Sequence, residues 1–170
     1  MSFIRQMIRW MDNIAQNVGV TVSWILWAMV FVTIWDILLR YLFKSGSVAI
    51  QNLEWYFFGI NFLLAIAMNF KDNSNARIDI FYNSFSKKTQ AIIEVIGNIL
   101  FLLPFCLAVL WWAYPFVQSS WEVREASPDP GGLPCIYLMK AVIPVAFVLL
   151  LVGAIPNTIK NIFTILDLEE

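Results

Sequence analysis

Six polar residues lie inside long apolar runs of this sequence, and their spacing limits the chemistry available to them. They form three pairs, which are Asp36 with Arg40, Glu54 with Asn61, and Glu94 with Asn98. Spacings of four or seven place both members of a pair on one helical face. Such side chains hydrogen-bond to each other, to a neighbouring helix or to a partner subunit, and so fix how helices pack. For Asp36 and Arg40 we favour a structural ion pair over a role in transport.

Residues suited to metal, redox or covalent chemistry are scarce. The sequence contains no histidine, and its two cysteines, Cys106 and Cys135, do not have the spacing of a metal site. Haem, zinc and iron–sulfur centres depend on clustered His or Cys ligands. No nucleophile has a base beside it. We therefore expect neither an enzyme nor a bound cofactor. A disulfide would require both thiols to reach the outer face, whereas Cys106 is expected inside a helix.

The composition is that of a membrane protein. Of the 170 residues, 60% are hydrophobic and 14% are charged, and the net charge of -1 comes without a basic block that would indicate nucleic-acid binding. Four apolar runs are long enough to cross a bilayer as helices. Short connections between them predict an all-α fold, a single membrane domain over 1–170 with an antiparallel four-helix bundle. The spans are predicted at 18–39, 49–70, 89–116 and 136–159.

The N-terminal segment 1–14 has a different pattern. Its apolar and polar residues separate onto opposite helical faces, which is typical of an amphipathic helix lying on the membrane surface, with Trp10 at headgroup depth. The alternative is a polar extension of the first span. That span is too long for the apolar core of a signal peptide, and Arg40-Tyr41 follows it in place of a cleavage site. We therefore expect the N-terminus to be retained.

Lysine and arginine residues predict the orientation, because cytoplasmic segments retain positive charge. Seven fall on the side of the two termini and four on the other side. Both termini are therefore predicted to be cytoplasmic. The seven are Arg5, Arg9, Lys71, Arg77, Lys87, Lys88 and Lys160, and the four are Arg40, Lys44, Arg124 and Lys140.

The middle of the membrane is left to apolar residues. Transporters that hold their own solute commonly show internal repeats, broken helices and central carboxylates, and this sequence shows no such set. Its aromatic residues exceed what two headgroup belts require, which favours a lateral protein interface. A scaffold subunit is therefore preferred to the alternative, a self-contained oligomeric transporter or channel. The aromatic residues are Trp24, Trp27, Trp35, Trp55, Tyr56, Trp111, Trp112, Tyr114, Trp121 and Tyr137.

Several sequence blocks together resemble one family, the small membrane subunit (DctQ-like) of tripartite ATP-independent periplasmic (TRAP) transporters. The resemblance extends from Met11 to Ile159. One departure is visible in the second connection, where the family usually has His before Val-x-Val-Asp and this chain has Asn75 before Ala76-Arg77-Ile78-Asp79. The blocks are Asp36–Phe43 (DILLRYLF), Glu54-Trp55, Ala65–Tyr82 (AIAMNFKDNSNARIDIFY), Trp121–Pro134 (WEVREASPDPGGLP) and Lys140–Phe147 (KAVIPVAF).

The resemblance implies an auxiliary role and two protein partners. In such systems a large membrane subunit binds the solute and sodium ions and moves as an elevator, while a soluble periplasmic protein delivers the solute. The small subunit is similar to a fixed platform beside the large one, in the bacterial inner membrane and surrounded by its lipids. The family transports small organic anions, carboxylates or sulfonates. In the cytoplasmic connection, Asn75, Arg77 and Asp79 are the matching polar residues.

The outer loop Trp121–Pro134 combines acidic residues with turn formers. Two prolines and two glycines within Pro128–Gly132 predict a defined turn, because proline fixes φ and glycine permits positive φ. A solvated acidic cover is one reading. The other is a docking surface, because the predicted topology places this loop in the periplasm, where the solute-delivering protein that the resemblance implies must dock. The residues concerned are Glu122, Glu125, Asp129, Gly131 and Gly132.

Overall fold

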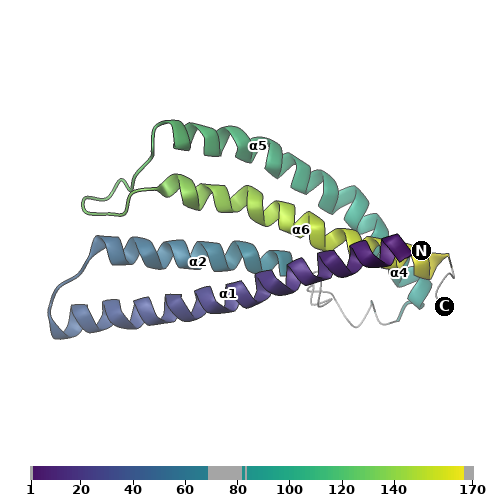
Figure 1. The fold of residues 1–170 in the computed structure, drawn as a ribbon, viewed down its shortest axis with the longest axis horizontal. Coiled ribbons are helices and arrows are strands. Elements are labelled where there is room, and N and C mark those ends of the chain that lie inside the picture. The colour runs from purple at the N-terminus through teal and green to yellow at the C-terminus, as the bar shows by residue number, and fades with distance from the viewer. Residues whose placement is uncertain (1, 69–81, 83, 167–170) are drawn as a thin grey trace.

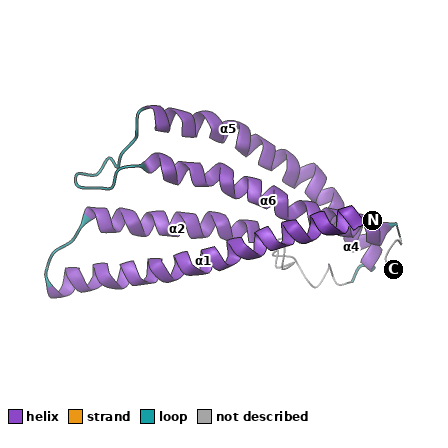
Figure 2. Ribbon diagram, viewed as in Figure 1, coloured by secondary structure: helices purple, strands orange, loops and turns teal. Residues whose placement is uncertain are grey.

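The computed structural model describes residues 2–68, 82 and 84–166, and this part of the chain is almost entirely helical, with no strand (Figures 1 and 2). A π-helical turn at Asn98–Leu102 joins two of the helices into one continuous rod. The predicted all-α class is therefore confirmed. The helices are α1 Ser2–Leu42, α2 Val48–Met68, α4 Lys87–Gly97, α5 Leu103–Glu122 and α6 Ile136–Ile165.

The helices pack in an order that differs from their order in the chain. α1 and α2 form a hairpin, α2 also packs on α6, and α6 packs on both α4 and α5 (Figure 1). The start of α1 and the end of α6 lie together, while the α1–α2 turn and the α5–α6 loop lie at the opposite end. This second end is called the outer end below, after the topology proposed for the chain. The two central helices are thus α2 and α6, and the two edge helices are α1 and α5.

Helix α1 is one unbroken helix of 41 residues. The segment 2–14 is helical as expected, but it continues into the first span without the break that a separate surface helix would need. The physical reason is that no proline occurs between Ser2 and Leu42, so a change of polarity alone does not end the helix. At 1.5 Å per residue α1 is about 60 Å long, roughly twice the hydrocarbon thickness of a bilayer. A surface location for 2–14 stays a prediction.

Three described helical stretches are long and apolar enough to cross a membrane, namely Gln16–Leu42, Lys87–Glu122 and Ile136–Ile165. Helix α2 has 21 residues, which is sufficient length, but Gln51, Asn52, Glu54 and Asn61 lower its hydropathy. The four-span count therefore stays a prediction for α2. Helices α5 and α6 continue to Glu122 and Ile165, beyond residues 116 and 159 where the predicted spans end, because polar residues continue a helix until a turn ends it. The limits of the spans themselves stay predictions.

Local sequence accounts for the main irregularities. Lys44 adopts the left-handed conformation (φ 49°), and the Ser45 N–H donates to the Leu39 carbonyl at 3.3 Å, which closes the end of α1. Ser86 caps α4 by accepting from the Thr89 N–H. The π turn ends two residues before Pro104, which lacks an N–H to donate to the preceding turn.

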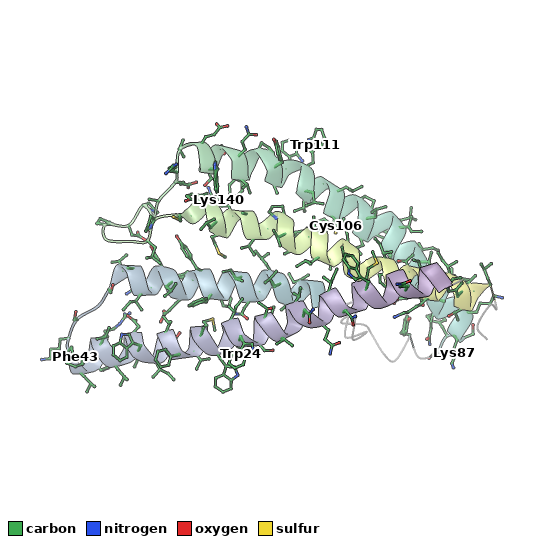
Figure 3. The ribbon with its side chains drawn as sticks, in the orientation of Figure 1. Trp24, Phe43, Lys87, Cys106, Trp111 and Lys140 are labelled. Carbon is green, nitrogen blue, oxygen red and sulfur yellow. The ribbon has the colours of Figure 1, made fainter. Side chains whose placement is uncertain are left out.

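Little of the chain is buried within itself. A small core forms where Cys106 of α5 and Leu150 of α6 meet, with Ile66 of α2 against them. Many large apolar side chains are exposed instead, and Trp24 and Trp111 point outward from the two edge helices (Figure 3). Exposed apolar surface on this scale belongs in a bilayer or against another subunit.

Candidate functional site

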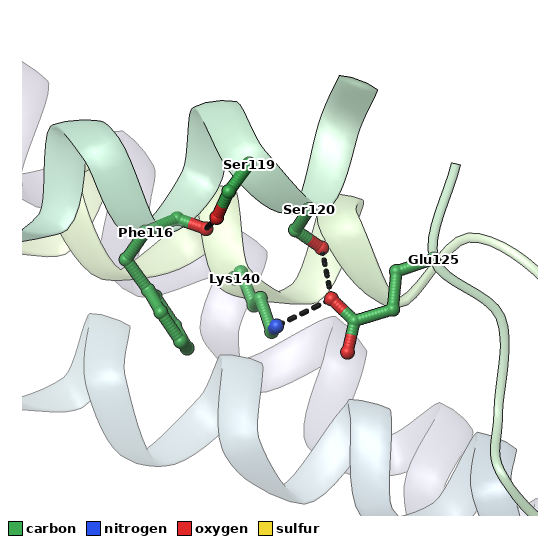
Figure 4. Close-up of polar contacts among 5 residues, drawn as sticks. All are labelled: Phe116, Ser119, Ser120, Glu125 and Lys140. Atoms are coloured by element: carbon green, nitrogen blue, oxygen red, sulfur yellow. Dashed lines mark hydrogen bonds and ion pairs between the residues drawn. The ribbon is translucent and has the colours of Figure 1, made fainter. Parts of the chain in front are cut away.

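A polar cluster ties together the outer ends of α5 and α6 (Figure 4). The Lys140 ammonium donates to the Glu125 carboxylate at 2.5 Å, and the Ser120 hydroxyl donates to the same oxygen at 2.5 Å. Ser120 is buried near the end of α5, and Glu125 follows that helix in the loop. The cluster therefore links α6, the loop and α5 through one carboxylate.

The surroundings of Glu125 favour its charged form. The hydrogen bond from Lys140, and then that from Ser120, lower the pKa of the Glu125 carboxyl, and the positive charge of Lys140 acts in the same direction. The Lys140 ammonium also lies 4.3 Å from the centre of the Phe116 ring, in cation–π geometry. Lys140 is thus held between an anion and an aromatic face near the start of its helix.

The rest of the loop is clamped onto α2. The Leu133 N–H donates to the Asn52 side-chain oxygen at 3.1 Å, and the Ser127 N–H donates to the Leu133 carbonyl at 3.0 Å. Gly131 has a φ of 81°, and a Cβ at Gly132 would lie 2.4 Å from the Ser127 hydroxyl and 2.6 Å from the Asn52 oxygen. Both glycines are therefore required by the turn, as the sequence predicted.

The three predicted docking acids lie in different settings. Glu122 was expected in the loop but is the last residue of α5. Its carboxylate accepts a hydrogen bond from the neutral Gln118 side-chain amide at 2.9 Å. Asp129 is exposed at the tip of the loop, whereas Glu125 is half-buried and ion-paired. Sequence reasoning missed Ser120, Lys140 and Asn52 as the groups that hold this loop. One signal was available. Lys140 lies one turn inside an apolar helix and has no acid near it in sequence, which indicates a partner on another segment.

Asp36 and Arg40 form the predicted ion pair on α1. Asp36 is 3% exposed, while the Arg40 side chain is about half exposed. The second oxygen of Asp36 is buried without a hydrogen-bond partner, and so is one oxygen of Glu54 on α2. The pair is therefore present, but the polar groups around it are not all satisfied within the described part of the chain.

Asn61 and Asn98 are equally buried, at 9% exposure, but differ in their partners. The Asn61 amide donates to the Phe57 carbonyl of its own helix, and its oxygen has no partner. The Asn98 amide donates to the Thr158 hydroxyl of α6 at 3.0 Å. Glu94 is not joined to Asn98 through their side chains in the way its spacing allowed, and it accepts from the Tyr82 hydroxyl at 3.3 Å instead.

The remaining predicted residues lie elsewhere. Asn75, Arg77 and Asp79 fall outside the described residues, so their placement stays a prediction. Cys106 and Cys135 are free thiols, the first buried and the second half-buried. Among residues 2–68, 82 and 84–166, no group of three or more His, Cys, Asp or Glu side chains could hold a metal ion.

The apolar helices, the exposed aromatic edges and the polar outer end together describe a multi-pass membrane protein. Comparison with known families gives the class more closely. The family of tripartite ATP-independent periplasmic transporters, DctQ component, matches residues 29–164. The chain therefore belongs to the DctQ family, the small component of TRAP transporters, which is a family of transporter components without a catalytic role. No curated protein matches the chain.

Proposed function

We propose that this chain is the scaffold subunit of a sodium-coupled TRAP transporter for a small organic anion, a carboxylate or sulfonate. It packs beside a large elevator-type membrane subunit, which binds the solute and the ions. Membership of the DctQ family is the observation that carries this proposal. That family works with DctM and DctP components, which we take to be the large membrane subunit and the periplasmic protein. Two features of the chain support it further. Charged side chains in the described helices lie toward their ends, and large apolar residues remain exposed on both edge helices.

A reconstitution experiment tests the scaffold role. The purified chain in liposomes should take up no solute under a sodium gradient, whereas liposomes that also contain the large subunit, with the periplasmic protein outside, should do so. Substrate is assigned separately by thermal shifts of the periplasmic protein against a panel of carboxylates and sulfonates. Uptake by the small subunit alone would favour a self-contained oligomeric transporter and overturn the proposal.

The proposed location is the bacterial inner membrane, with both termini in the cytoplasm. The charge count supports this orientation, and Lys87 lies at the end that holds the termini, while Phe43 lies at the other (Figure 3). In a background with Cys106→Ala and Cys135→Ala, a cysteine within 72–84 should be shielded from membrane-impermeant thiol reagents in spheroplasts. A cysteine at Asp129 should be labelled. The reverse pattern would invert the topology.

We propose that the outer loop, with Glu122, Glu125 and Asp129, is the surface on which the periplasmic protein docks. A loop clamped by Asn52 presents its acids in a fixed arrangement, which favours electrostatic steering of a partner. Because Glu125 is paired with Lys140, Glu122 and Asp129 supply most of the field.

Neutralising Glu122 and Asp129 together should slow uptake that depends on the periplasmic protein, and should weaken its salt dependence. Glu125→Gln alone should have a smaller effect on the salt dependence, since it removes one negative charge and the double variant removes two. Assembly with the large subunit, measured by co-purification, is the control and should be unchanged. Unchanged uptake and salt dependence in the double variant would reduce the loop to a cover over the bundle.

A further inference from the structure

An apolar groove with a volume of about 460 Å³ lies where α5 packs against α6. Its small members, Ala108 and Ala113, leave space between larger aromatic side chains. Every lining residue belongs to a candidate membrane span and none is charged. The lining comprises Phe105, Ala108, Val109, Trp112, Ala113 and Phe116 of α5 with Ile143 of α6. The groove therefore opens into hydrocarbon if these helices cross the bilayer.

The length of the groove corresponds to one leaflet. From Phe105 to Phe116 the helix rises about 16 Å, which is close to half of the roughly 30 Å hydrocarbon core. At the inner limit, Phe105 packs edge-on against Phe147 of α6 with the ring centres 5.7 Å apart. A membrane-spanning helix of another subunit that packed along α5 would extend over the whole core, about twice the length of the groove. One acyl chain fits this length, whereas such a helix exceeds it.

A cation stands at the outer limit of the groove. Phe116, which lines the groove, carries the Lys140 ammonium on its ring face, and the Lys140 side chain is 20% exposed. One ammonium proton bonds to Glu125, and an ammonium has three to donate. Arg124 is exposed just beyond the end of α5. Positive charge at this depth matches the phosphate of a phospholipid in the outer leaflet.

We propose that the groove binds one acyl chain of a phospholipid whose phosphate contacts Lys140. This inference goes beyond the scaffold role and does not depend on it. Inside a bilayer the acyl chain gains dispersion contacts in the groove, because it is already out of water. Selection of a phospholipid therefore comes from the contact between phosphate and ammonium. The bound lipid fills the space between α5 and α6 and anchors the outer end of the bundle at a fixed depth.

Native mass spectrometry of the purified full chain tests the groove. After delipidation, the chain is titrated with phosphatidylglycerol and with a diacylglycerol that has the same acyl chains but no phosphate. Wild type should bind one added phosphatidylglycerol per chain. Ala108→Phe fills the groove and should abolish that adduct, whereas Ala65→Phe, a matched change at an exposed alanine of α2, should leave it unchanged.

The phosphate contact is tested by two variants that break the same ion pair. Lys140→Gln removes the cation and should lower phospholipid occupancy about fivefold, with no effect on diacylglycerol. Glu125→Gln keeps the cation and should leave occupancy equal or higher. Equal losses of phospholipid occupancy in both variants would assign the effect to the broken Lys140–Glu125 ion pair and overturn the phosphate contact.

Three further results would overturn the proposal. Equal adducts in Ala108→Phe and wild type, or equal losses in Ala108→Phe and Ala65→Phe, would mean that annular lipid only was present. Unchanged lipid binding in Ala108→Phe, together with lost co-purification of the large subunit, would mean that a helix of that subunit occupies the groove.

Discussion

The outer ends of α5 and α6 differ from the helices α1 and α2 in how far their buried polar groups are satisfied. At the outer end, Glu125, Ser120 and Lys140 satisfy one another, and Asn52 binds the loop backbone. On α1 and α2, by contrast, Asp36, Glu54 and Asn61 each leave one oxygen buried without a partner among the described residues. Since an unsatisfied buried polar group costs free energy, the first region stabilises the chain by itself and the second does not.

Burial of a polar residue in this fold therefore does not by itself assign a role to it. Those at the outer end hold the chain together whatever surrounds it. The unpaired oxygens on α1 and α2 stabilise the assembled transporter if a neighbouring subunit or water supplies the missing donors. Measurements on the isolated chain separate the two regions, because the outer cluster finds its hydrogen-bond partners within the described residues, whereas one oxygen each of Asp36, Glu54 and Asn61 does not.

The largest effect is expected at Gly132. Gly132→Ala would place a Cβ against the Ser127 hydroxyl and the Asn52 oxygen, and relief of these contacts breaks the clamp between the loop and α2. We expect the free energy of unfolding to fall by about 2 kcal/mol, as for other overpacked sites. Thermal unfolding of the purified chain in detergent measures it.

Two other glycines serve as controls for Gly132→Ala. A Cβ at Gly46 meets nothing within 4 Å, so Gly46→Ala should leave the unfolding temperature unchanged. A Cβ at Gly59 meets the flexible end of Met139, which can move. Gly59→Ala should therefore lower the free energy of unfolding less than Gly132→Ala does. Equal stability of Gly132→Ala and Gly46→Ala would mean that the outer end is not clamped.

A smaller effect is expected from the titration of Glu125. Its pKa is lowered from the ordinary value of 4.5 by the hydrogen bond from Lys140 and then by that from Ser120. A lowered folded-state pKa stabilises the protein above the ordinary value, and this stabilisation is lost as pH falls through the lowered pKa. Wild type should therefore lose its advantage over Glu125→Gln below about pH 4.5.

Unfolding temperatures of wild type, Glu125→Gln and Lys140→Met between pH 7 and pH 3 measure this dependence. Lys140→Met removes the main cause of the lowered pKa, so its profile should follow that of Glu125→Gln. A constant difference between wild type and Glu125→Gln at all pH values would show that the ion pair does not stabilise the outer end.

The same contrast explains what the sequence could predict. The ion pair of Asp36 with Arg40 is local, four residues apart on one helix, so spacing alone identified it. Lys140 and Glu125 are 15 residues apart, and Asn98 and Thr158 are 60 apart. These contacts depend on how helices pack and on how the loop turns at Gly131, which no local pattern contains.

The ends of the helices could not be predicted from hydropathy, for a related reason. Hydropathy marks where a helix is apolar, but backbone chemistry decides where it ends. α1 therefore begins at Ser2 and continues through the polar residues that were expected to separate a surface helix. α5 ends at Glu122, where the chain turns and Arg124 takes a positive φ of 45°. The glycine turn was predictable because Gly131 and Gly132 occur together with prolines.

The smallest effect, and the most direct comparison, is expected from two asparagines with the same burial. Asn98→Leu removes the interhelical hydrogen bond to Thr158 and should lower stability by about 0.6 kcal/mol, the average for such bonds in membranes. Asn61→Leu removes a buried oxygen that has no partner, and it should leave the isolated chain equal or more stable. Unfolding in detergent gives both values. In the complex with the large subunit, Asn61→Leu should become destabilising if that subunit supplies the missing donor. A loss of stability for Asn61→Leu in the isolated chain, equal to that for Asn98→Leu, would remove the distinction between the two regions.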